Sequence, residues 1–186
     1  GKWGYLDFPI VARYARTLGK DCLGMTGKFH TSWGDFHSLK NQAALEFECF
    51  RALSFGFACS IGDQLEPSGV LNPATYQLIG TVYRKYAERE QWARPSKAVA
   101  EVAVVSPEDG IKGGIPDCIR GAVQMLEELA VQFDLIDMAS DFSGYRLLIL
   151  TEGLNISAEY AASLEAYTQN GGSLIAIADG GLCGGS

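Results

Sequence analysis

The chain has 186 residues, of which 47% are hydrophobic and 20% are charged, a composition that excludes a disordered chain and allows one or two folded domains. The formal net charge of -7 argues against nucleic acid as a partner, because an acidic surface repels the phosphate backbone. No apolar run approaches the length of a membrane span, so no membrane partner is predicted either.

The cysteines and histidines predict a reduced protein without a metal site or cofactor. There are five cysteines, an odd number, and no two are spaced as in a CxxC zinc motif. Neither His30 nor His37 has a His or Cys at metal-ligand spacing. Because the first residues carry no signal-peptide pattern, we predict a cytoplasmic location, with secretion left open since a fragment could have lost its leader.

The first half of the chain alternates helices with short strands. Pro9 and Gly19 bracket one helix in the order that favours helix starts and ends, Ser38 is the expected N-cap of a second, and Pro73 lies in the first turn of a third. These signals and the apolar spacing predict helices over residues 9–18, 38–55 and 73–91 and strands over residues 21–26 and 57–61.

A proline-containing stretch at residues 94–97 interrupts the pattern, which then restarts. The second half is predicted to contain helices over residues 116–132 and 157–169 and strands over residues 101–106, 133–137, 146–151 and 174–178. The strand RLLILT at 146–151 is apolar along its length, so we expect it to be buried on both faces, as in a parallel sheet covered by helices.

The elements predict an α/β protein with one domain over residues 1–95 and another over residues 96–186. The second domain has the strand and helix order of a flavodoxin-like or Rossmann-like fold. The first contains only two clear strands, and two parallel strands cannot close a barrel. We therefore interpret the first domain as the last two units of something larger.

The stretch KFHTSWGDF at residues 28–36 follows the first strand. It gathers rings and polar groups directly after an apolar run, so it is either a loop packed for local structure or the wall of a site for a polar ligand. Together with LKNQAALEFECFRAL at 39–53 and CSIGDQLEPSG at 59–69, it resembles the end of the catalytic barrel in bacterial glycoside hydrolases with a beta-galactosidase trimerisation domain. Some members of this group are alpha-L-fucosidases.

The resemblance implies the C-terminal part of a (β/α)8 TIM barrel, followed by a class I glutamine-amidotransferase-like domain of the trimerisation type that serves oligomer contacts. Residues 21–26 and 57–61 would be the last two strands of the barrel, whose site lies at the carboxyl ends of the strands. The residues implied to bind a carbohydrate there are Trp33, which offers a flat face to a pyranose ring, and His30, Asp35, Asp63 and Gln64, which offer hydrogen bonds to hydroxyl groups.

Glycoside cleavage needs two carboxyl groups flanking the bond, and in the resembling enzymes they would come from middle strands upstream of Gly1. Asp35 and Asp63 are candidates by position alone. In the alternative interpretation Asp35 caps the next helix and Asp63 fixes a turn. The expected function is therefore a segment of an alpha-L-fucosidase-like or beta-galactosidase-like hydrolase that is inactive by itself, binds carbohydrate and belongs to a homo-oligomer.

Two other functions stay open. The sequence GLCGG at residues 181–185 follows an apolar strand and has the form of the nucleophile elbow of class I glutamine amidotransferases, with Cys183 as the nucleophile. Its His and Glu partners would lie downstream. The chain could also act only as an association module, because part of a barrel exposes a large apolar face.

Overall fold

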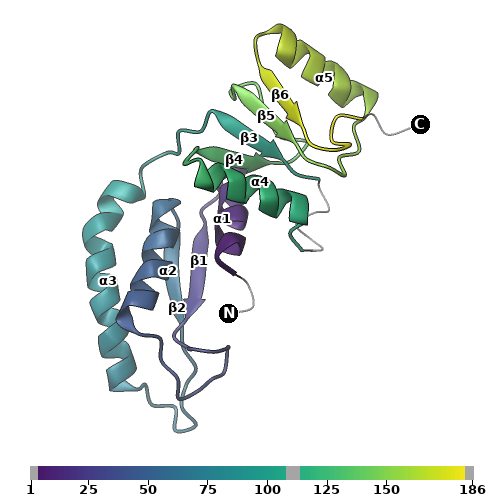
Figure 1. Ribbon diagram of the computed structural model, residues 1–186. Helices are drawn as coiled ribbons and strands as arrows, with labels where there is room; N and C mark the ends of the chain where they lie inside the picture. Colours follow the sequence, from purple (N-terminus) through teal and green to yellow (C-terminus); the bar gives the residue numbers. More distant parts are fainter. Residues whose placement is uncertain (1–3, 108–113, 183–186) are drawn as a thin grey trace. The chain divides into compact units, whose positions relative to one another are not determined.

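In the computed structural model, residues 4–107 and 114–182 are described, and they form two compact units. One unit contains residues 19–98, and the other contains the remaining described residues, including the helix at the start of the chain. Both units consist of helices and parallel strands (Figure 1), and in the second unit β4 and β5 follow each other without a helix between them. The predicted α/β class with parallel sheets is confirmed.

The first unit is built on two parallel strands, β1 (Leu23–Gly27) and β2 (Ala58–Gly62), which pair along their whole length. Two helices, α2 (Gln42–Ser54) and α3 (Pro73–Ala93), pack together beside them. Side chains from both helices bury a common core against one face of the strands. The core contains Leu45, Cys49, Leu53, Val82 and Tyr86, with Cys59 and Ile61 of β2 packed against it.

The predicted start of α2 is wrong. Its N-cap is Asn41, whose side chain accepts a hydrogen bond from the backbone N–H of Ala44 at 2.8 Å, and Ser38 lies in the preceding loop. The physical reason is that Lys40 N–H donates to the Lys28 carbonyl at 2.7 Å, which keeps the chain out of a helix up to that point. By contrast, α3 starts as predicted, with Asn72 as N-cap and Pro73 in its first turn.

The second unit has a parallel sheet of four strands in the order β4-β3-β5-β6. The strands are β3 (Val102–Val105), β4 (Phe133–Ile136), β5 (Leu147–Leu150) and β6 (Ser173–Ala176). The side chains of Val104, Phe133 and Ile149 belong to one buried cluster, and those of Val105, Leu148 and Leu150 to another. The predicted burial of the RLLILT strand on both faces is confirmed. A flavodoxin-like assignment stays a prediction.

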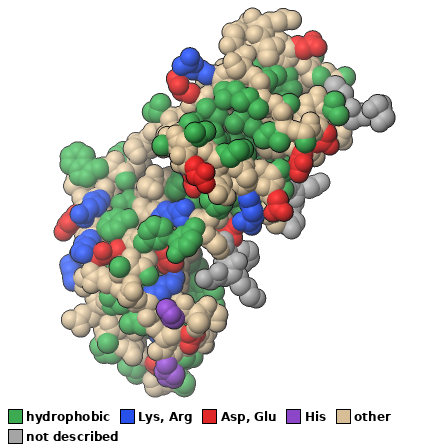
Figure 2. All heavy atoms as spheres, viewed as in Figure 1, with side chains coloured by type: hydrophobic (Ala, Val, Ile, Leu, Met, Phe, Trp, Pro, Cys, Tyr) green, Lys and Arg blue, Asp and Glu red, His purple; other side chains and the backbone are tan. Residues whose placement is uncertain are grey.

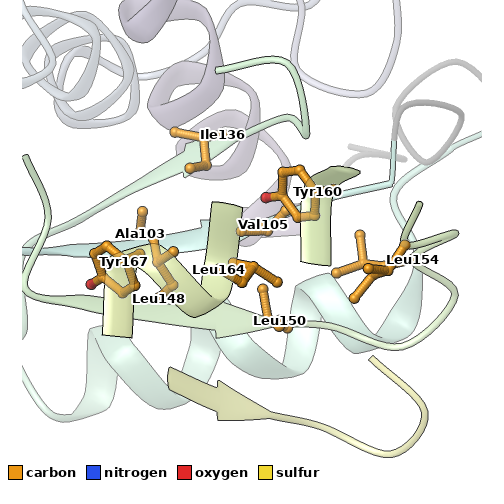
Figure 3. Close-up of a cluster of buried hydrophobic side chains, with 10 residues drawn as sticks. Ala103, Val105, Ile136, Leu148, Leu150, Leu154, Tyr160, Leu164 and Tyr167 are labelled. Carbon is orange, nitrogen blue, oxygen red and sulfur yellow. The ribbon is translucent and has the colours of Figure 1, made fainter. Parts of the chain in front are cut away.

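Helices cover both faces of this sheet. On one face, α5 (Ala158–Gln169) buries Tyr160, Leu164 and Tyr167 against the strands (Figure 3). On the other face, α4 (Asp117–Glu128) contributes a buried stripe made of Ile119, Ala122, Val123 and Leu126. The sheet is thus sandwiched between helical layers, as its apolar strands require.

The first helix, α1 (Gly4–Ala15), packs beside α4 on the same sheet and continues into the short 3-10 helix η1 (Arg16–Leu18). It was predicted to begin at Pro9, but it begins at Gly4 with Pro9 inside. The earlier start has a packing reason, because Leu6 and Ile10 both join the core cluster of the second unit. The predicted first domain over residues 1–95 included this helix, whereas the structure groups it with the second unit.

Charged and polar contacts fix α1 in place. Arg13 Nη1 lies 2.8 Å from Glu127 Oε1, and the guanidinium stacks 4.1 Å from the ring centroid of Phe133. Arg16 lies 2.6 Å from Asp134, Tyr14 donates to Asp137 at 2.8 Å, and Arg120 lies 2.5 Å from Asp7. The start of the chain therefore belongs to the second unit, residues 19–98 form the first unit, and the chain rejoins the second unit after residue 98.

None of the described helices has both the length and the apolar character of a membrane span.

Replacing Ile10 by Ala should lower the free energy of unfolding by about 3 kcal/mol, because Ile10 is fully buried in the core of the second unit. The matched control is Val11→Ala in the same helix, where the side chain is 43% exposed and we expect a change below about 0.5 kcal/mol. Urea unfolding followed by circular dichroism measures both. Equal effects at the two positions would contradict the packing of α1.

Candidate functional site

The candidate site lies where the two strands of the first unit end. Gly27 of β1 is the register partner of Gly62 of β2, so the loops that follow them leave from the same edge. The backbone N–H of Lys28 donates to the Gly62 carbonyl at 2.9 Å, which extends the strand pairing by one residue. Residues 28–41 and 63–72 therefore begin side by side.

The indole of Trp33 lies directly on the strand ends. A Cβ atom at Gly62 would be 2.4 Å from Cη2 of Trp33, and one at Gly27 would be 3.5 Å from the same atom, so the first of these glycines is required for the ring to lie there. The ring of buried Phe29 packs beside it at a centroid distance of 5.4 Å and an angle of 60°. Trp33 is nevertheless 60% exposed, so a supported aromatic surface is open to solvent.

A buried ion pair underlies this surface. Lys28 Nζ lies 3.0 Å from Asp63 Oδ1, and the two side chains are only 5% and 10% exposed. The same ammonium donates to the carbonyl of Phe36 at 3.3 Å, and the same carboxylate oxygen accepts from the backbone N–H of Gln64 at 2.7 Å. Charges this deeply buried are stable only when paired, so the pair joins the two loops.

Asp35 organises the loop that carries Trp33. Hydrogen bonds from the side chains of Ser38 and then Thr31 are the main causes that hold the pKa of Asp35 below its ordinary value, and the nearby His30 adds a smaller effect. Ser38 Oγ also accepts from the backbone N–H of His30 at 2.8 Å. The helix that follows is capped by Asn41, so Asp35 has a role within the loop rather than as a cap.

The remaining predicted residues lie on the surface at the same edge. His30 and Gln64 are exposed, and Gln64 Oε1 lies 3.5 Å from where a Cβ of Gly34 would be. Figure 2 shows the histidine side chains at the surface. All five predicted binding residues thus lie in the two loops that follow β1 and β2, and Asp63 is the one whose charge is neutralised by a buried partner.

A second polar network anchors the other end of the Trp33 loop. Lys40 Nζ lies 2.7 and 2.9 Å from the carboxylate oxygens of Glu48 on α2 and 3.0 Å from the Thr26 hydroxyl. Thr26 donates in turn to Glu48 at 2.5 Å. Residues 28–41 are therefore tied to β2 at their start and to α2 at their end.

Among residues 4–107 and 114–182, no three His, Cys, Asp or Glu side chains gather as metal ligands would. Cys183, the candidate amidotransferase nucleophile, lies outside the described residues.

A family model matches part of the second unit. Residues 123–182 match the model of the beta-galactosidase trimerisation domain. This part of the chain is similar to a beta-galactosidase trimerisation domain. A comparison with curated proteins found no match.

Solved structures extend the likeness beyond the trimerisation domain. Alpha-L-fucosidase isoenzyme 2 from Paenibacillus thiaminolyticus is 40% identical over 98% of this chain, with a TM-score of 0.88. The predicted resemblance to bacterial glycoside hydrolases with a trimerisation domain is confirmed. The match covers 28% of the fucosidase chain, so the present chain spans less than a third of that relative.

Two beta-galactosidases share the fold at lower identity. The enzyme from Bacillus circulans sp. alkalophilus is 15% identical over 93% of this chain and 30% of its own, with a TM-score of 0.71. A catalytic mutant of Gan42B from G. stearothermophilus is 17% identical over 92% of this chain and 29% of its own, with a TM-score of 0.72. The fold thus recurs in enzymes with little sequence in common.

Ser38→Ala should raise the pKa of Asp35 toward its ordinary value of 3.8, because the largest cause of the lowered pKa is removed. Since the folded pKa is below the unfolded one, this carboxylate stabilises the fold above the unfolded pKa, and its contribution is lost as the pH falls through the folded pKa. Carboxyl NMR titration measures the midpoint. The control Ser54→Ala removes an exposed hydroxyl at the end of α2; an unchanged Asp35 midpoint in Ser38→Ala would refute the contact.

Proposed function

We propose that this chain is part of a glycoside hydrolase and that β1 and β2 are the last two strands of its (β/α)8 barrel. Each strand is followed by a helix, and both helices pack on one side of the pair. On β1, Leu23 and Met25 are 59% and 63% exposed, although both are apolar. In a barrel such residues point into an interior filled by side chains of the other strands, which accounts for an apolar face with no cover among the described residues.

The loops after β1 and β2 form, in this proposal, part of the carbohydrate-binding rim. The observation that supports it is the position of Trp33, whose ring lies on Gly62 at the carboxyl end of two parallel strands and is still largely exposed. A fixed aromatic face fits the C–H side of a pyranose, and ordering it beforehand reduces the entropy that binding must overcome. His30, Asp35, Asp63 and Gln64 supply hydrogen-bonding groups in the same two loops.

The proposed substrates are fucosides first and galactosides second, following the names of the similar enzymes. We place the catalytic carboxyl pair in other strands of the barrel. Asp63 is ion-paired with Lys28, and the lowered pKa of Asp35 suits a permanently ionised loop residue rather than a general acid. The chain alone should therefore not turn over substrate.

Trp33→Ala in the full-length enzyme should raise KM for an aryl alpha-L-fucoside about thirtyfold, as expected when a central aromatic contact of roughly 2 kcal/mol is lost. We expect kcat to change much less, because the ring binds substrate and transition state alike. Trp92→Ala is the matched control, since Trp92 is 75% exposed on α3. The proposal fails if KM of the Trp33 variant stays at the wild-type value.

The second unit is proposed to hold copies of the chain together, as the name of its domain indicates. The amidotransferase alternative has less support, because the match is to a trimerisation domain and ends before Cys183. It requires glutamine hydrolysis that is abolished by alkylation of this thiol.

Light scattering on the purified chain at micromolar concentration should give three times the monomer mass of 20.0 kDa, because the trimerisation domain mediates self-association. The measurement is repeated after dilution, which should leave a stable assembly unchanged. A monomer mass at every concentration would contradict the assignment of an assembly role to the described part of this domain.

A further inference from the structure

We propose that Lys28 is a positioning residue that keeps the Trp33 ring in contact with Gly62, and that the Lys28–Asp63 ion pair thereby determines the affinity for the sugar. This inference rests on the proposed function for its binding readout. It concerns a residue that has no place among the predicted sugar contacts.

The position of Lys28 in the loop explains why one ammonium can order the whole segment. Lys28 directly precedes the segment 29–36 that carries Trp33, and its Nζ donates to the carbonyl of Phe36 at the other end of that segment. The two ends are therefore bound to a single charge. Phe29, which packs on the Trp33 ring, lies between them, with its centroid 5.7 Å from the ammonium.

The third contact of Lys28 joins this segment to the surface on which the ring lies. Asp63 immediately follows Gly62, the residue that Trp33 covers, and its carboxylate is 3.0 Å from Lys28 Nζ. The ion pair thus fixes the distance between the Trp33 segment and the end of β2. Without it, the side-chain contact between the two loops that lies nearest to the indole is lost.

Burial distinguishes this role from direct binding and from general core stability. Lys28 is only 4% exposed, so its ammonium is shielded from a ligand on the open face of Trp33. The pair also lies outside the hydrophobic core that α2 and α3 form with β2. Its loss leaves the packing of that core in place, while the partner charge that remains unpaired lowers the free energy of unfolding.

The experiment compares Lys28→Met, Lys28→Arg and Asp63→Asn in the full-length protein, and each variant is also made with Trp33→Phe so that the difference in fluorescence reports on Trp33 alone. We expect Lys28→Met and Asp63→Asn to raise KM for an aryl fucoside about tenfold, with kcat within about threefold of wild type, as for a lost binding contact. Acrylamide should quench the fluorescence of Trp33 more strongly in both variants than in the wild type. Lys28→Arg keeps the positive charge, so its changes in KM and in quenching should be at most half as large as those of Lys28→Met.

Lys85→Met is the matched control. It breaks a 2.6 Å ion pair with Glu46 between α3 and α2, away from the strand ends, and should change neither readout.

The inference is overturned if Lys28→Met and Asp63→Asn leave both KM and quenching within about twofold of the control. If the wild-type enzyme cleaves neither fucosides nor galactosides, the proposed function fails, while the quenching of Trp33 still decides whether Lys28 holds the ring. Should Lys28→Met not fold, the quenching of Trp33 in Asp63→Asn decides, because Asp63 is itself a proposed sugar contact and its effect on KM alone would not separate the two roles.

Discussion

The packing of the Trp33 ring against the backbone of Gly62 is the contact on which the candidate site depends. It exists because two parallel strands end in register with glycine, so that an indole can approach the main chain where a Cβ at Gly62 would collide with it. The buried Lys28–Asp63 pair then joins the loops on either side of this contact, and the Lys40–Glu48 pair anchors the far end of the Trp33 loop to α2. A long loop is thereby held at a few charged points rather than by a core of its own.

In the second unit, specific contacts hold the helix from the beginning of the chain against a sheet whose strands lie far along the sequence. Ile10 supplies apolar burial, while Arg13 and Arg16 pair with Glu127 and Asp134. These pairs are partly buried and specific in geometry, so they determine where the helix sits as well as that it binds. The chain runs from η1 directly into the first unit, so α1 belongs to the second unit although it precedes the first unit in the sequence.

Local signals in the sequence predicted what local physics controls. The Asn72-Pro73 pair placed the start of α3, and the apolar strand RLLILT was correctly expected to be buried on both faces. The start of α2 was missed because Ser38 and Asn41 are both good N-caps, and the choice depends on the hydrogen bond between Lys40 and the Lys28 carbonyl. The Lys28–Asp63 pair left one usable signal, a charge of opposite sign directly after each of two neighbouring strands. The packing partners of α1 could not be predicted, because the apolar spacing of a helix shows which face is buried but not which surface buries that face.

A crystal structure of the full-length protein with bound fucose tests the central claim most directly. The account predicts a pyranose lying flat on the exposed face of Trp33, with ring carbons at contact distances of about 4 Å and hydroxyl groups within reach of His30 or Gln64. The Trp33 ring should remain on Gly62, and Lys28 should remain paired with Asp63. A sugar bound elsewhere on the barrel, or an indole turned away from Gly62 in its presence, would contradict the account.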